Sequence, residues 1–316
     1  MQEEKKEIPI ICLMCGNLVA IKKEGLYDIH FGVPNLFDIA CCPSCGFEQT
    51  TPQPTPQELK QFYEEYYNFG GERGTVYTRL REWFFSSFFY RLWLYIDGDV
   101  SFHGIKGEGR LLDVGCNEGR GLQIYQKNGF DAEGLEINEN AAKVAREKGF
   151  TVHICLIEDF QPKVPYDVVV LSNVLEHVFN PKEVIYNIRR VLKPGGELWI
   201  SCPNTKSWFG LVFGRKWVNW HVPFHISHFS EFILCQLLED AGFRVIKSKS
   251  ETPSLIIAQS IICSLFSIRG RPTVQIRNPF LIGPLMLLVR ATLFPFLYLL
   301  DLLGKGGDLV VISSRS

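Results

Sequence analysis

Two pairs of cysteines near the start of the chain are spaced to bind a metal ion. Cys12 and Cys15 are separated by two residues, as are Cys42 and Cys45, and a glycine follows the second cysteine of each pair. Four thiolates on two tight turns supply the tetrahedral sulfur ligands of structural zinc sites. Iron or a redox pair is the alternative, which the repeated glycine disfavours. We therefore predict one structural Zn2+ ion with no open position for chemistry.

A glycine loop later in the chain is suited to holding a nucleotide-like ligand. Residues 111–119 read LLDVGCNEG, a strand-like run that leads through Asp113 to turns at Gly115 and Gly119. Glycine lets the backbone turn sharply and approach a ligand closely. Glu136 ends the next expected strand, where a carboxylate can accept hydrogen bonds from both ribose hydroxyls. Because ordinary strand–helix turns also contain glycine, this interpretation needs support from the rest of the pattern.

Several histidines lie where a general base could act on a hydroxyl group. His221, His225 and His228 fall within eight residues, and His177 follows the fourth expected strand. A neutral imidazole can remove a proton from a hydroxyl nucleophile near neutral pH. We place His225 first as the base, then His221, then His177. His228 has a structural alternative, since it precedes Ser230, which has the character of a helix N-cap.

From residue 110 the chain alternates strands with helices, which indicates a largely parallel sheet covered by helices. The run 168–171 is apolar throughout, as in a parallel strand buried on both faces. The expected strands are 110–114, 132–136, 151–155, 167–171, 197–202, 244–248 and 309–313. The expected helices are 120–127, 139–148, 181–192 and 230–241. The carboxyl ends of such strands form the edge where ligands bind.

Five segments of this region resemble a known family. In order they read DVGCNEG, GLEIN, EDF, YDVVVLSNVLEHVFNP and LKPGGELWISCPN. Together they resemble the class I S-adenosylmethionine-dependent methyltransferases, especially the ubiquinone-biosynthesis-like branch, over roughly residues 108–250 and 308–315. The resemblance implies an α/β fold with a Rossmann-like seven-stranded methyltransferase sheet. It also implies S-adenosyl-L-methionine as the cofactor and methyl donor.

The resemblance assigns cofactor-binding roles by position. The implied cofactor-binding residues are Asp113, Gly115, Cys116, Asn117, Gly119, Glu136, Ile137, Asp159 and Asn173. Glu136 would hold the ribose, Ile137 would lie against the adenine and Asp159 would meet its amino group. Asn117 stands where the family usually has glycine, and asparagine tolerates the left-handed backbone that such a loop needs. A nicotinamide dehydrogenase is the rival interpretation, but the full G-x-G-x-x-G pattern is missing.

A second resemblance indicates which class of molecule accepts the methyl group. The cysteine pairs followed by the aromatic run 62–67 resemble zinc-ribbon methyltransferases of bacterial sugar and surface-polysaccharide pathways. The long extra C-terminal domain of sugar C-methyltransferases is missing, which argues against C-methylation. We predict O-methylation of a small-molecule or lipid-linked saccharide acceptor. The alternatives are an RNA methyltransferase whose ribbon recognises RNA, disfavoured because no basic stripe is interleaved with aromatics, and a catalytically silent S-adenosylmethionine-binding module.

Metal-dependent catalysis is not expected. In ubiquinone O-methyltransferases the pattern E-x-x-E-H can hold a divalent ion. Here the corresponding residues are Asn173, Glu176 and His177, so one carboxylate is missing.

Composition and segment boundaries complete the prediction. With 46% hydrophobic residues and a net charge of −1, the chain can bury a core and has no overall field that attracts DNA. The N-terminus lacks the apolar stretch of a signal peptide, and the five cysteines after Cys45 are scattered singly, as in a reducing cytoplasm. The expected segments are a zinc ribbon (1–50), a linker with an aromatic helical segment (51–104), the methyltransferase domain (105–252), an apolar helical insertion (253–305) and the last strand (306–316).

The apolar insertion has three interpretations. Its second apolar run, 280–303, is long enough to span a bilayer, but a single span would put the last strand on the wrong side. A buried lid is the first interpretation, a hairpin at the membrane surface is the second, and a true membrane span is the third. Arg269, Arg271 and Arg277 between the two runs prefer the cytoplasmic side. We therefore expect a cytoplasmic protein, with contact to the inner face of the membrane as an additional hypothesis.

Overall fold

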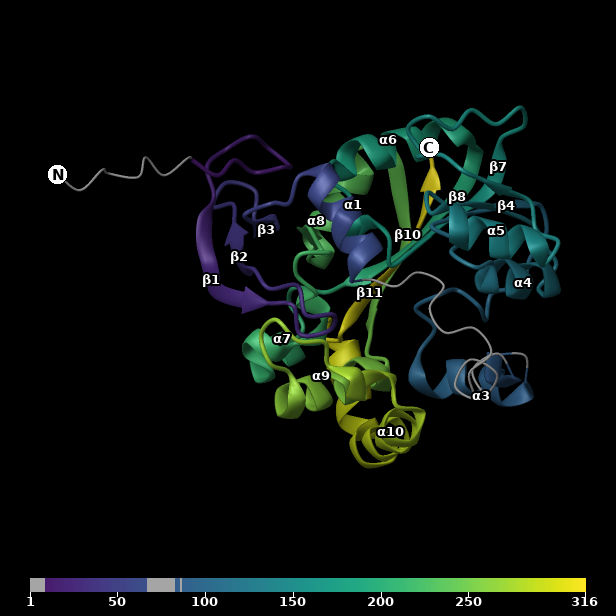
Figure 1. Cartoon of the computed structure of the whole chain (residues 1–316). Helices are drawn as coiled ribbons and strands as arrows, with labels where there is room; N and C mark the ends of the chain where they lie inside the picture. Colours follow the sequence, from purple (N-terminus) through teal and green to yellow (C-terminus); the bar gives the residue numbers. More distant parts are fainter. Residues whose placement is uncertain (1–8, 67–82, 86) are drawn as a thin grey trace.

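A seven-stranded sheet forms the centre of the molecule, as expected from the strand–helix alternation (Figure 1). The computed structural model describes residues 9–66, 83–85 and 87–316. The strands are β4 (Arg110–Val114), β5 (Asp131–Leu135), β6 (Val152–His153), β7 (Tyr166–Ser172), β8 (Leu192–Pro203), β10 (Phe243–Glu251) and β11 (Asp308–Arg315). Their spatial order is β10-β11-β8-β7-β4-β5-β6, and only β11 runs antiparallel to its neighbours. This is the Rossmann-like arrangement that the sequence predicts.

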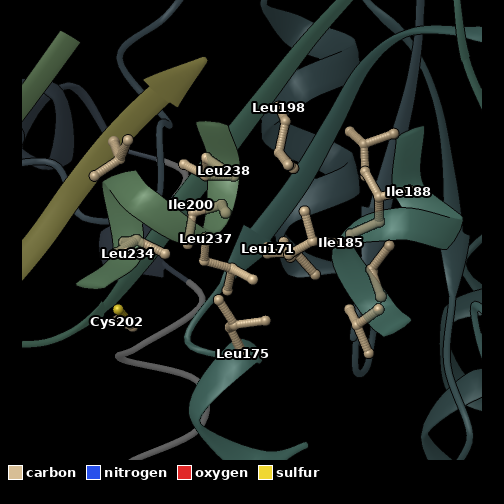
Figure 2. Close-up of a cluster of buried hydrophobic side chains, with 14 of the residues drawn as sticks. Leu171, Leu175, Ile185, Ile188, Leu198, Ile200, Cys202, Leu234, Leu237 and Leu238 are labelled. Atoms are coloured by element: carbon tan, nitrogen blue, oxygen red, sulfur yellow. The ribbon is translucent and has the colours of Figure 1, made fainter. Parts of the chain in front are cut away.

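Helices cover both faces of the sheet because the strands are largely apolar and their consecutive side chains point to opposite faces. Leu112 and Leu171 point to the face that packs against α6 (Pro181–Val191) and α8 (Glu231–Asp240). Figure 2 shows Leu171 among the leucines and isoleucines of these two helices. Leu111 and Val170 point to the opposite face, which α4 (Arg120–Lys127) and α5 (Glu139–Glu147) cover. The two-residue period of a strand places neighbouring side chains on opposite faces. The core therefore lies in two layers, one on each side of the sheet.

Capping residues fix where the covering helices begin. The Asn180 side chain accepts a hydrogen bond from the N–H of Glu183, and Pro181 occupies the first turn of α6. The Ser230 side chain likewise accepts from the N–H of Ile233, which confirms the N-cap expected for α8. Such caps satisfy backbone donors that have no partner within the helix. The main departure from the predicted strands is β6, which keeps only two residues because it pairs briefly with β5 at the sheet edge.

The cysteine-rich segment builds a second, smaller sheet that extends into the later part of the chain. It contains β1 (Ala20–Tyr27), β2 (Leu36–Cys41), β3 (Glu48–Thr51) and β9 (Ser227–His228), in that order. Strand β9 belongs to the histidine-rich segment and pairs antiparallel with β3. The ribbon sheet and the histidine segment are therefore one continuous structure.

The stretch that the sequence predicts as a linker is instead structured at both ends. Thr51 ends β3, and Thr55 caps α1 (Pro56–Glu65). Thr55 and Glu58 form a reciprocal capping box, in which each side chain accepts a hydrogen bond from the other residue's backbone. The expected aromatic helical segment continues in α3 (Phe88–Asp97), and its part at 67–82 and 86 lies outside the described residues.

The apolar insertion forms two helices that differ in burial. Helix α9 (Ser254–Phe266) is largely buried, whereas α10 (Pro279–Leu302) is long and apolar enough to cross a membrane but has only 22% of its apolar window buried. The chain then enters the sheet as β11, the second strand from one edge, between β10 and β8. Helix α9 is therefore buried in the protein, whereas α10 is not.

Candidate active site

The glycine loop after β4 has the left-handed backbone conformations that its residue types allow. Gly115 and Gly119 have φ values of 76°, and Asn117 has a φ of 49°. A Cβ atom on Gly115 would lie 2.8 Å from Cγ2 of Val174, so the loop passes close to the residue that follows Asn173 after β7. Glycine is required at this position for both backbone conformation and space.

This loop lies at the point where the strand order of the sheet reverses. Strand β4 pairs with β5 on one side and with β7 on the other, although β7 comes later in the chain than β5 and β6. In open α/β sheets, ligands bind outside the carboxyl ends of the strands at such a switch point. The backbone there is open, since Gly115, Asn117 and Asn173 are all exposed. Asn173 also adopts a left-handed conformation, with a φ of 54°.

Two acidic residues flank the loop. The carboxylate of Glu136, directly after β5, accepts hydrogen bonds from the backbone N–H groups of Asn117 (2.9 Å) and Asn138 (2.8 Å). Burial raises the pKa of Glu136, and burial together with the nearby Glu136 charge raises the pKa of Asp113 to about 7. A ligand that brings hydroxyl donors and a positive charge would stabilise the ionised forms of both groups. A ligand with a positive charge and hydroxyl donors would therefore fit this edge.

The remaining predicted cofactor residues take different positions. Ile137 and Asp159 are exposed and follow β5 and β6, at the same edge of the sheet. The thiol of Cys116 is buried, because Gly134 leaves space for it on the neighbouring strand. Cys116 can therefore face a ligand only through its backbone.

The four predicted metal ligands converge at one point. The Sγ atoms of Cys12 and Cys45 are 3.6 Å apart, those of Cys15 and Cys42 are 3.4 Å apart, and all four lie within 4.8 Å of one another. Zinc–sulfur bonds of about 2.3 Å in a tetrahedron place sulfur atoms about 3.8 Å apart. The four-cysteine cluster is thus compatible with zinc, in the geometry expected from the C-x-x-C-G spacing.

The three predicted bases, His177, His221 and His225, form a cluster. The ring centres of His177 and His225 are 4.6 Å apart, and those of His221 and His225 are 4.8 Å apart. Nδ1 of His221 lies 3.3 Å from Nε2 of His225. A fourth member, His30, was not predicted from the sequence, and its ring centre lies 4.6 Å from that of His221. These groups form a continuous imidazole cluster rather than isolated bases.

Backbone carbonyls fix the orientation of two imidazoles. Nδ1 of His225 is 2.9 Å from the carbonyl oxygen of Asn219, and Nδ1 of His177 is 3.0 Å from that of Phe224. Since a carbonyl can only accept, Nδ1 of His225 carries the proton and its Nε2 carries the lone pair. Nδ1 of His177 also lies 3.0 Å from the hydroxyl of Tyr63, a group that can donate or accept. Burial lowers the pKa of His177 to about 4 and that of His225 well below its ordinary value. Both rings are therefore neutral at physiological pH.

Glu176 is the most unusual group of this cluster. Its side chain is 1% exposed, its two carboxyl oxygens have no hydrogen-bond partner among the described residues, and one oxygen lies 3.9 Å from Nε2 of His225. Burial, with a smaller effect of the Asp308 charge, raises the pKa of Glu176 to about 8. One donor atom each of Glu176, His177 and His225 lie within 4.8 Å, a set that could hold a metal ion. This geometry was not expected, because His225 is remote in sequence.

The ribbon holds the histidine segment in place. The Thr50 hydroxyl donates to the carbonyl oxygen of His225 (2.6 Å) and accepts from Nε2 of His228 (2.9 Å), and the Thr50 N–H donates to the carbonyl oxygen of Ile226 (2.9 Å). The N–H of Ile226 donates in turn to the carbonyl oxygen of Glu176 (2.8 Å). A chain of backbone bonds thus connects β3 of the ribbon to the segment that follows β7.

Comparison with known proteins finds similarity to methyltransferases in the region that forms this site. A family model described as a methyltransferase domain matches residues 94–248. A ubiquinone biosynthesis O-methyltransferase of Klebsiella pneumoniae subsp. pneumoniae is 33% identical over 134 residues, which cover 39% of this chain and 55% of that protein. The protein of the same name from Thiobacillus denitrificans is 32% identical over 147 residues, which cover 42% of this chain and 63% of that protein. The chain thus spans little more than half the length of these curated relatives.

A solved structure shares the fold. The crystal structure of the cyclase SpnF is 18% identical, has a TM-score of 0.50 and covers 83% of this chain and 97% of its own. At this identity the likeness shows the fold alone, and a fold hosts more than one reaction. Family match, sheet order and motif positions together identify a class I S-adenosylmethionine-dependent methyltransferase domain in this chain.

Proposed function

We propose that this chain uses its class I methyltransferase domain to transfer a methyl group from S-adenosylmethionine to a hydroxyl of a small-molecule or lipid-linked saccharide. The observation that carries the proposal is that the segment 173–177 contacts the cofactor loop and also contains two members of the imidazole cluster. Val174 lies against the cofactor loop at Gly115, and Glu176 and His177 of the imidazole cluster follow at once. One short segment therefore joins the edge that suits the cofactor to the groups that can accept a proton.

The residues of the cofactor edge hold and orient the donor. The bound cofactor would supply an electrophilic methyl group on a sulfonium ion, and transfer from it is an in-line displacement that depends on alignment of donor and acceptor. Glu136 would accept hydrogen bonds from the ribose, which fixes the adenosyl group along the edge. Burial raises the pKa of Asp113 to about 7. A bound cationic ligand would lower that pKa and favour the ionised carboxylate.

The imidazole cluster removes the acceptor proton. A neutral imidazole with its lone pair on Nε2 can accept a proton as the hydroxyl oxygen attacks. His221 is half-buried and its Nδ1 faces Nε2 of the buried His225, so a proton can pass between the two rings. An imidazolium at His225 would lie 3.9 Å from Glu176, whose carboxylate form would stabilise the charge.

Several observations support an oxygen acceptor. A hydroxyl needs a base during methylation, and the chain supplies buried imidazoles at the end of β7. The curated relatives are named as O-methyltransferases. The combination of a four-cysteine ribbon and an aromatic helix α1 resembles methyltransferases of saccharide pathways, and it is this resemblance that leads us to propose a saccharide.

The proposal is tested by measuring S-adenosylhomocysteine formation in the presence of glycolipid and sugar extracts from the host. Wild-type chain should form the product with at least one extract, whereas Glu136→Gln should need far more S-adenosylmethionine for the same rate. Product formation with RNA but with no saccharide fraction would replace our acceptor with the alternative one. Tight cofactor binding without any product from saccharide, lipid or RNA fractions would identify a silent binding module instead.

A further inference from the structure

A large part of one end of the molecule is apolar and faces solvent. Helix α10 contributes most of this surface and lies at the bottom of Figure 1, with α7 (Trp208–Val212) to its left and α3 to its right. Trp208 and Phe296 connect α7 to α10 with ring centres 5.0 Å apart. Arg290 of α10 donates to the carbonyl oxygen of Ile96 in α3 at 2.7 Å. We call this surface the apolar end.

The apolar end is far more hydrophobic than an ordinary protein surface. The apolar window of α10 has a mean hydropathy of 1.9, yet only 22% of it is buried. Phe280, Leu287 and Tyr298 all point into solvent along the helix. Contiguous exposed apolar surfaces on this scale mark sites that bind proteins or membranes.

Helix α10 cannot cross a bilayer while the fold is intact. Before the helix, the N–H of Thr273 donates to the carbonyl oxygen of His30 in the ribbon segment (2.9 Å). After it, the Asn204 side chain donates to the carbonyl oxygens of Gly304 and Gly306 (3.1 Å each). A helix of 24 residues is about 36 Å long, which exceeds a hydrocarbon core of about 30 Å. Because both ends are bound to the same folded body, the helix lies along its surface.

Charge at the apolar end matches an anionic lipid surface. Between Glu251 and Asp301 the chain has four arginines and no acidic residue. Three of them, Arg269, Arg271 and Arg277, are exposed and alternate with exposed apolar side chains, from Leu265 at 72% to Phe280 at 79% exposure. We call residues 265–280 the basic tip. Apolar side chains interleaved with basic ones are typical of segments that enter the headgroup region and attract anionic lipids.

The apolar end adjoins the proposed active site. Asp308, the first residue of β11 after α10, pairs with Pro203 at the carboxyl end of β8. The hydroxyl of Ser172, at the carboxyl end of β7, donates to the carbonyl oxygen of Val100, just after α3. The carboxyl edge of the sheet, where the cofactor is proposed to bind, is therefore on the same side of the sheet as the apolar end.

We propose that the apolar end and the basic tip bind the surface of an anionic phospholipid bilayer, with α10 lying in the headgroup region. The binding itself does not depend on the proposed methyl transfer. If both hold, the bilayer surface lies next to the edge of the sheet where a lipid-attached hydroxyl would be methylated.

Vesicle flotation of the full chain tests the proposal without any cofactor. Wild type should float with vesicles of phosphatidylglycerol and phosphatidylcholine and not with phosphatidylcholine alone. The triple variant Arg269→Gln/Arg271→Gln/Arg277→Gln and the double variant Leu265→Ser/Phe280→Ser should each lower binding at least tenfold, since each basic residue near an anionic surface strengthens attraction. Phe232→Ser, at an exposed phenylalanine of α8, is the matched control and should bind as wild type does.

Three outcomes overturn the proposal. They are no flotation of the wild type with anionic vesicles, equal loss of binding in the Phe232→Ser control, and a stable wild-type dimer that Phe280→Ser dissociates while vesicle binding is absent. The last outcome would assign the apolar end to a second copy of the chain. Thermal unfolding of each variant checks that the fold is retained.

Discussion

The contact between the ribbon and the histidine segment can be tested at a single side chain. Thr50 is fully buried, and its hydroxyl donates to the carbonyl oxygen of His225 at 2.6 Å and accepts from Nε2 of His228 at 2.9 Å. The substitution Thr50→Val keeps the shape of the side chain and removes only these two bonds. It leaves no cavity, so any loss of stability reports the polar contacts.

The size of the effect follows from the two groups that lose their partner. A buried donor or acceptor left without a partner costs about 1–3 kcal/mol. With one acceptor at His225 and one donor at His228, we expect Thr50→Val to lower the free energy of unfolding by about 3 kcal/mol. Folded domains have about 5–15 kcal/mol of stability, so the variant should still fold.

Urea unfolding, followed by tryptophan fluorescence, measures this loss. A matched control is Thr252→Val, because Thr252 is also fully buried and its hydroxyl bonds with Asp301 at 2.6 Å and with the N–H of Gly307 at 3.0 Å. Both variants should lose similar stability. Only Thr50→Val should change the NMR signals of His225 and His228. A loss below about 0.5 kcal/mol, or unchanged histidine signals, would refute a positioning role for the ribbon.

The remaining predictions concern the metal cluster, the base and the buried acid. Wild type should contain one zinc per chain and Cys12→Ser/Cys15→Ser should contain none, as measured by metal analysis; a metal-free wild type that is well folded would contradict the zinc assignment. His221→Ala and His225→Ala should each lower turnover by roughly 10²–10⁴-fold, the usual contribution of a general base, and full turnover in both would end that assignment. Chelation under conditions that leave the ribbon zinc in place should not change wild-type turnover. Burial raises the pKa of Glu176 to about 8 from 4.5, so its contribution to stability is complete below pH 4.5 and is lost as pH rises to 8. Glu176→Gln should therefore gain stability relative to wild type between pH 5 and pH 9 in urea unfolding, and a constant difference would contradict the raised pKa.

The sheet and the cofactor edge were predictable because their signals are local. The first strands of the methyltransferase domain are short apolar runs, each followed by a turn and a helix, and the chain order of such units constrains the sheet. The left-handed backbone at Asn117 was also expected, because the family that the chain resembles usually has glycine there and asparagine tolerates this conformation. Positions such as Gly115 and Glu136 could therefore be placed at one edge before the fold was known.

The ribbon interface was not predictable because its partners are far apart in the chain. The prolines after Thr51 are typical of a linker, but β3 is completed by β9, which lies 175 or more positions later. His30 joins the histidine cluster through the same long-range packing. Nothing near Glu176 in the sequence shows that it is buried beside His225. Pairings of this kind depend on tertiary contacts rather than on local pattern.

The central claim is that the turn at Gly115 and the carboxylate of Glu136 bind the adenosyl group of S-adenosylmethionine. Calorimetric titration of the intact chain with S-adenosylhomocysteine tests it most directly. We predict one site per chain, with affinity at least tenfold weaker in Glu136→Gln, since a hydrogen bond to a charged group contributes about 1.5–3 kcal/mol. A wild-type chain that is folded and releases no heat with either form of the ligand would contradict the account.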